Sequence, residues 1–278
     1  MLRLEIKKVF ESKSFLLSLI LGMLIVLLQA SWVKKYLEVA YMDSESLVYS
    51  RIADVSFLQG WIGQDPFSAY AYMFYLVLFP MLAAMPYGAN HFKEHKLGYD
   101  KNVICRIGKR KYFITKYIAA FFSGGMVVTI PSVISLMWSM TWLPLIPIDL
   151  SMAYTGVNVD SLWGEIFFEH PLLYALLYIA LDFVIAGVFS TCSLALTFIV
   201  KSEFQIMIFP MLINIFLVEL LNYAPGVLGK VCRMVPYCYV SPYSLVAVSG
   251  WEIILSLSIL MVVTLFTYYY VGRKGDVL

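Results

Sequence analysis

Six long stretches of apolar residues constrain this chain more than any other feature of its sequence. A helix needs about 20 mainly apolar residues to cross roughly 30 Å of hydrocarbon. Of the 278 residues, 61% are hydrophobic and 14% are charged, whereas a soluble domain is about half apolar and about a quarter charged. The sequence therefore predicts an all-α integral membrane protein that forms a single domain over 1–278. The six predicted spans cover about 15–32, 69–87, 118–142, 172–200, 206–221 and 253–271.

Positive charge is distributed unevenly between the two sides that these spans define. The segment before the first span and the loop between the second and third spans carry 12 of the 20 Lys and Arg, and three more fall on the same side. Lys and Arg near spans are held in the cytoplasm, so both termini and the loop 88–116 are predicted to be cytoplasmic in a plasma-membrane protein. The net charge of +2 gives no support for nucleic-acid binding.

Residues 1–13 are predicted to form an amphipathic helix that lies in the membrane interface. Leu2, Ile6, Val9 and Phe10 recur at helical spacing, and Arg3, Lys7, Lys8 and Glu11 occupy the rest of the surface. A helix with this pattern places its apolar face in lipid. The alternative is an ordinary basic flank that only orients the first span.

The cytoplasmic loop 88–116 is predicted to be structured. Residues 91–97 can form two helical turns that Gly98 ends, and Asp100 can cap a second short helix that stops near Gly108. The third span would then begin at Lys109, whose charge stays at the lipid headgroups.

The outer segment 222–250 is apolar and aromatic but contains helix breakers. It begins with a cluster that includes Pro225 and Gly226, and Pro236 and Pro242 follow. Irregular backbone at membrane depth needs cover from protein or a water-filled cavity, so a pair of re-entrant or interfacial helices is predicted. Cys232 and Cys238 lie here, where oxidation is permitted; whether they form a disulfide stays open.

The order of these elements resembles the permease subunits of ABC-2 type ABC transporters. Members of that family have a cytoplasmic amphipathic elbow helix, six spans, a coupling helix between spans two and three, and short re-entrant helices before span six. Tyr99 and Asp100 depart from the family, which often has a small hydroxyl residue after the glycine. The counterparts of its second-loop motif are Phe92, Glu94, Gly98, Ile104, Arg110, Tyr112, Phe113 and Lys116.

The resemblance implies the membrane subunit of an ATP-driven exporter. Two separate ATPase subunits would bind ATP and Mg, and a second permease subunit would complete a homodimer or heterodimer. This chain has no G-x-x-x-x-G-K-[ST] phosphate loop, so no cofactor is expected on it. The residues implied to contact the ATPase are Phe92, Glu94, His95, Lys96, Leu97, Gly98 and Tyr99.

Aromatic, Met and Asn side chains in spans two and five are candidates for a cargo path, since spans two and five line the path in the family. Met and aromatic side chains suit an adaptable apolar route, and they are also ordinary packing residues of a helix bundle. The candidates are Tyr72, Tyr75, Phe79, Met207, Met211 and Asn214.

Asp182 is a carboxylate inside the fourth span. A charge at this depth costs a few kcal/mol, so the side chain must face protein, water or a partner. Small and hydroxyl residues share its face, namely Ala186, Ser190, Ser193 and Thr197. Close helix packing and an intramembrane polar site or conduit both account for this face.

Two other classes of function remain as alternatives. Residues 91–95 match H-x-x-E-H, in which two His hold zinc and Glu acts as the base, so an intramembrane zinc protease, or a lipid transferase, is one. Catalytic zinc wants a third protein ligand, and the remaining His, His170, is predicted on the far side. An ATP-independent channel or carrier is the other. The leading prediction is an exporter of an apolar or amphipathic peptide, lipid or drug.

Overall fold

The computed structural model describes residues 1–42, 56–64, 69–146, 157, 161–223, 234–240 and 248–274. Within these ranges the chain is helical and contains no β-strand. The elements are α1 (Leu2–Phe10), α2 (Lys13–Met42), α4 (Phe57–Gly60), η2 (Ile62–Gln64), α5 (Ala69–Met73), the π-helical turn η3 (Phe74–Leu78), α6 (Phe79–Lys96), α7 (Tyr99–Ile107), α8 (Lys109–Trp142), α9 (Gly164–Glu169), α10 (Pro171–Leu196), α11 (Glu203–Tyr223), α13 (Tyr237–Val240) and α14 (Gly250–Lys274).

Six helical segments in the described ranges are long and apolar enough to cross a membrane, which confirms the predicted all-helical, six-span pattern. Most extend beyond the apolar stretch that predicted them, because polar residues at their ends continue the same helix. The six segments are Lys13–Glu38, Ala69–Lys96, Lys109–Trp142, Pro171–Leu196, Glu203–Leu220 and Gly250–Gly272.

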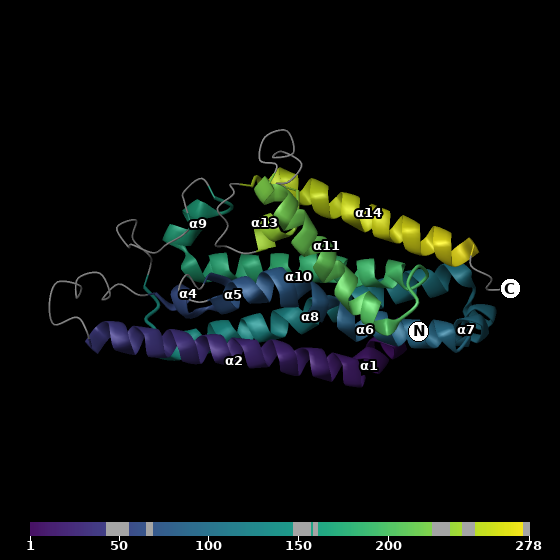
Figure 1. Ribbon diagram of the computed structural model, residues 1–278, viewed down its shortest axis with the longest axis horizontal. Helices are drawn as coiled ribbons and strands as arrows, with labels where there is room; N and C mark the ends of the chain where they lie inside the picture. Colours follow the sequence, from purple (N-terminus) through teal and green to yellow (C-terminus); the bar gives the residue numbers. More distant parts are fainter. Residues whose placement is uncertain are drawn as a thin grey trace.

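The long helices run along a common direction (Figure 1). The N-terminus and the end of α14 lie in the half of the molecule that contains α7, as an even number of crossings requires, whereas α4 and α9 lie at the opposite end. The helix α1 sits at the start of α2 and packs against α8.

Two glycines set the helix boundaries in 88–116. The second long helix does not end near 87 but continues as α6 to Lys96, so the two predicted turns at 91–97 belong to the span helix itself. Gly98 adopts the left-handed conformation (φ 70°), and Gly108 separates α7 from α8 with φ 83°. These boundaries were predicted. The cap was not: Gly98 is the N-cap of α7, and Asp100 lies in its first turn with its side chain directed elsewhere.

Close packing of α8 against α10 forms the centre of the bundle. A Cβ on Gly124 would lie 2.4 Å from Ser190 Cβ and 2.9 Å from the Ala186 carbonyl oxygen. The backbones can therefore approach this closely only because residue 124 has no side chain.

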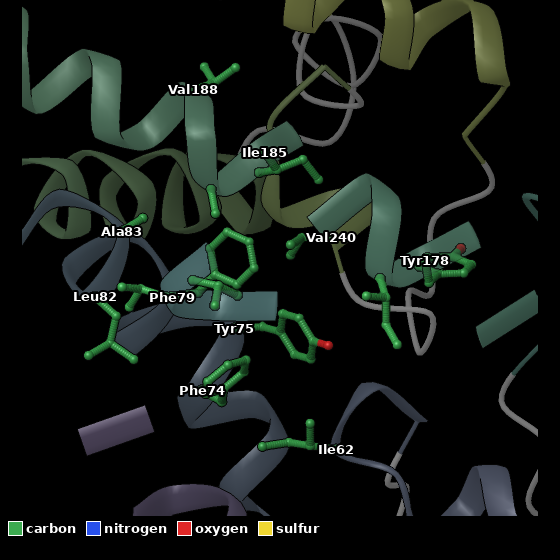
Figure 2. Close-up of a cluster of buried hydrophobic side chains, with 14 of the residues drawn as sticks. Ile62, Phe74, Tyr75, Phe79, Leu82, Ala83, Tyr178, Ile185, Val188 and Val240 are labelled. Carbon is green, nitrogen blue, oxygen red and sulfur yellow. The ribbon is translucent and has the colours of Figure 1, made fainter. Parts of the chain in front are cut away.

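A buried apolar cluster joins the second span to α10 (Figure 2). Phe74, Tyr75 and Phe79 come from η3 and the start of α6, and Ile185 of α10 and Val240 of α13 lie around them. The rings of Tyr75 and Phe79 have centroids 5.8 Å apart. This cluster holds the four-residue helix α13 against the bundle.

Most of the predicted re-entrant region lies outside the described residues, and Cys232 with it. In its described part, α13 is a short buried helix that contains Cys238, and α14 begins at Gly250. Whether Cys232 and Cys238 form a disulfide therefore stays open.

Candidate functional site

Four charged side chains from three helices meet at the α7 end of the bundle, and we call them the charge cluster: Glu5 and Lys8 of α1, Glu94 of α6 and Lys116 of α8. Lys116 Nζ lies 2.9 Å from Glu5 Oε2 and 2.5 Å from Glu94 Oε2. Lys8 also donates to Glu94. Because Lys116 is only 1% exposed, its charge depends on these two carboxylates for compensation.

Aromatic side chains complete the surroundings of Lys116. Tyr87 donates a hydrogen bond to Glu5 Oε2 at 3.2 Å. The rings of Tyr87 and Tyr112 both have centroids 5.6 Å from Lys116 Nζ, within the range of a cation–π interaction. Burial lowers the pKa of Lys8, but the hydrogen bond and the charge of Glu94 outweigh burial and raise that pKa above its ordinary value. The charge cluster thus connects α1, α6 and α8.

A second network connects α6, α7 and α8 through Asp100. His95 Nδ1 lies 2.9 Å from Asp100 Oδ2, and Tyr112 donates to Asp100 Oδ1. Burial raises the pKa of Asp100, yet the hydrogen bonds from His95 and Tyr112 and the nearby imidazoles outweigh burial and hold the pKa below its usual value. The short helix α7 is therefore fixed at its first turn to both neighbouring long helices.

Replacing Asp100 with Asn is expected to destabilise the protein by about 1–2 kcal/mol at pH 7, since the hydrogen bonds to a charged acceptor are lost. The pKa of Asp100 is lower in the folded than in the unfolded chain, where it is about 3.9. Its contribution is therefore complete above that value and is lost as the pH falls through the folded pKa. Thermal unfolding should show a difference in unfolding temperature between the parent protein and Asp100→Asn that is constant from pH 7 to about pH 4 and becomes smaller toward pH 3. A difference that does not change with pH would contradict this account.

The H-x-x-E-H residues face three different partners. His91 Nε2 lies 2.9 Å from Tyr268 Oη of α14, His95 bonds Asp100, and Glu94 belongs to the charge cluster. In the described ranges, no three His, Cys, Asp or Glu side chains gather as a metal site would require. Instead, the rings of Phe198 and Tyr268 pack against His91, and the ring of Phe113 packs against Tyr268.

The residues predicted to contact an ATPase divide into two sets. Phe92 is buried, and Glu94 and His95 turn inward to the two networks. The others form the exposed corner, by which we mean Lys96, Leu97, Gly98 and Tyr99 at the turn between α6 and α7. Leu97 at its tip is 83% exposed. The corner is therefore the exposed part of the predicted set, and the inward part connects it to the bundle.

The cargo-path candidates of span two do not share one face. Tyr72 is 55% exposed, with its ring 6.2 Å from that of Tyr237, whereas Tyr75 is 1% exposed and Phe79 is fully buried. The π-helical turn 74–78 lies between them and shifts the register of the helix. Met207 and Met211 of α11 are half-buried.

Asn214 compensates for a proline in the neighbouring span. Pro80 lacks an N–H, and its ring displaces the carbonyl four residues earlier, that of Leu76. Asn214 Nδ2 donates to this Leu76 oxygen at 3.0 Å from α11. Side chains of neighbouring helices make prolines tolerable in membrane spans in this way. Asn214 thus has a structural role beside α5–α6, and its Oδ1 is buried without a partner among the described residues.

Asp182 of α10 is fully buried and faces the π-helical turn η3. Tyr75 Oη donates to its Oδ2 at 3.3 Å, and its Oδ1 has no partner in the described part of the chain. The small residues predicted on its face are all buried too, and Ser190 meets Gly124 of α8. The geometry at Ser190 is that of close helix packing, and the site at Asp182 itself is polar and enclosed.

Sequence reasoning missed Glu5, the acid of α1 that Lys116 binds. A signal exists, since Glu5 falls one turn before Val9, on the side of α1 that packs against protein, while Leu4 is 71% exposed. An acid at an apolar register position indicates a buried partner.

Comparisons of the chain with protein-family models, with curated proteins and with solved structures give no match.

Proposed function

We propose that the chain is the membrane-spanning permease subunit of an ATP-driven exporter of the ABC-2 type. The observation that carries the proposal is the exposed corner, an apolar tip on a turn that two polar networks fix to α1, α6, α7 and α8. A force applied at Leu97 would reach α1, α6 and α8, because the two polar networks link the region around the corner to all three helices. In this proposal α1 is the elbow helix and the corner belongs to the coupling helix.

The remaining parts of the proposal follow from this role. The ATPase subunits, two for each pair of permeases, supply ATP and Mg, because the chain has no phosphate loop. Both termini and the corner face the cytoplasm, in line with the excess of Lys and Arg there. The cargo is an apolar or amphipathic molecule, in keeping with the aromatic and Met residues of the second and fifth spans.

The corner can be tested by site-specific crosslinking. A photoreactive amino acid at position 97 in the native membrane is expected to crosslink to a protein that carries a phosphate loop, whereas the same group at Leu4, the exposed leucine of α1, is not. Leu97→Asp should lower transport-coupled ATP hydrolysis of the purified complex by about tenfold, as loss of a hot-spot contact of about 1.4 kcal/mol or more would.

Equal crosslinking from positions 97 and 4 would contradict the assigned surface. Ion or solute flux through the purified chain alone in liposomes, unaffected by ATP, would favour the channel or carrier instead.

A further inference from the structure

A pocket of about 480 Å³ opens beside the charge cluster, between α1, the start of α2, α6 and α8. This volume falls within the range of small-molecule sites. Four Lys line it (Lys8, Lys13, Lys93 and Lys116) but only two carboxylates, Glu5 and Glu94. The lining therefore has an excess of positive charge, and the pocket favours an anion.

The cations are not all compensated. Glu5 and Glu94 neutralise Lys116 and Lys8, and Lys93 Nζ lies 3.1 Å from Glu203 of α11. Lys13 is exposed and has no ion pair in the described part of the chain. It is also the first residue of α2, where the helix dipole favours negative charge. The Phe15 N–H already donates to Ser12 Oγ at 3.2 Å, which leaves the N–H groups of Lys13 and Ser14 in this turn.

A buried donor provides independent support for a ligand. His91 lines the pocket and is 1% exposed, and its Nδ1 has no hydrogen-bond partner among the described residues. Its Nε2 bonds Tyr268, which does not line the pocket. When Tyr268 donates to Nε2, Nδ1 carries the proton and can donate to an anion. An unpaired buried donor costs free energy that an oxygen ligand would recover.

The position of the pocket relative to the membrane indicates what kind of anion it holds. Ser12, Lys13 and Ser14 line the pocket, and the apolar stretch of α2 begins directly after them at Phe15. Exposed Leu16, Leu17, Ile20 and Leu24 then follow along the same helix. A phosphate at the pocket would thus sit at headgroup level, with acyl chains along α2.

We propose that this pocket binds the phosphate of an anionic phospholipid, held by the Lys13 side chain, the N–H groups of Lys13 and Ser14 at the start of α2, and His91 Nδ1. Basic pockets between helices at the membrane surface hold lipid headgroups in this way. The lipid headgroup would lie beside the charge cluster and stabilise the packing of α1 against α2 and α6. The inference goes beyond the proposed exporter role and does not depend on an ATPase partner.

Native mass spectrometry of the full-length protein in detergent can test the site with three probes: dioctanoyl phosphatidylglycerol, dioctanoyl phosphatidylcholine and glycerol 1-phosphate. We expect phosphatidylglycerol to bind at least about tenfold more tightly than phosphatidylcholine, and Lys13→Gln to weaken it about fivefold, as one lysine near a membrane surface would. The matched control is Lys7→Gln, which removes an exposed lysine of α1 that does not line the pocket. It should leave binding unchanged.

A second variant, Ser14→Leu, keeps every charge and fills the mouth of the pocket, so it should abolish the preference for phosphatidylglycerol. The proposal is overturned if the two lipids bind alike, if Lys13→Gln and Lys7→Gln weaken binding equally, or if Ser14→Leu has no effect. Competition by glycerol 1-phosphate at the same concentration as the lipid would overturn the assignment to a lipid.

Discussion

Replacing Lys116 with Met is expected to destabilise the folded protein by about 3–5 kcal/mol, because the substitution leaves two carboxylates in the charge cluster without their shared cation. Glu5 is buried and Glu94 is largely so, and Lys8 reaches only Glu94. Thermal unfolding of the purified protein, followed by tryptophan fluorescence, measures the loss. Hydrogen exchange should locate it, with the amides of α1 losing protection first, since α1 depends on Glu5 for its polar contact with α8.

The control for this substitution is Lys109→Met in the first turn of the same helix. Lys109 is exposed and has no ion pair within the described residues, so its loss should change stability by less than about 0.5 kcal/mol. Adding Glu5→Gln and Glu94→Gln to Lys116→Met removes the stranded charges and should restore most of the stability. Equal unfolding of the two lysine variants, or no rescue by the two Gln substitutions, would show that the cluster contributes little.

The sequence predicted the helices of this protein well for a simple physical reason. A membrane span must satisfy its backbone hydrogen bonds internally, so a long apolar stretch leaves few structures other than a helix. Gly98 and Gly108 were also predictable as boundaries, because both adopt positive φ. The end of the second helix was predicted too early. The sequence becomes more polar after residue 87, but the helix is not interrupted before Gly98, and α6 continues to Lys96.

The candidate site was predictable only in part. The sequence placed Glu94 and Lys116 in the same loop motif, but the pairing of Lys116 with Glu5 joins residues 111 positions apart. Helical periodicity says which face a residue occupies and not which helix that face meets. Tyr72 does not share a face with Tyr75 and Phe79, because the π-helical turn 74–78 alters the helical spacing in span two. That these residues line a cargo path stays a prediction. The hydrogen bond from Asn214 to the Leu76 carbonyl could not be predicted either, because it joins two helices that are distant in the sequence.

Replacing Gly124 with Val is expected to destabilise the protein by about 3 kcal/mol, the upper end of the usual cost of overpacking. The new side chain would enter the contact between α8 and α10, where even its Cβ would lie only 2.9 Å from the Ala186 carbonyl oxygen. A backbone atom cannot rotate away as a side chain can, so the two helices must separate. That separation would also loosen the enclosed site at Asp182, one turn before Ala186 on the same helix.

Two further glycines make this prediction specific. A Cβ on Gly125 would meet the ring of Phe183 at 2.6 Å, and a Cβ on Gly250 would find only Leu162, at 3.9 Å. Because a ring on a flexible side chain can give way, Gly125→Val should cost less than Gly124→Val, and Gly250→Val should cost least. Thermal unfolding and the cysteine reactivity of Cys192 on α10 can rank the three variants. The same unfolding temperature for Gly124→Val and Gly250→Val would mean that α8 and α10 do not pack through residue 124.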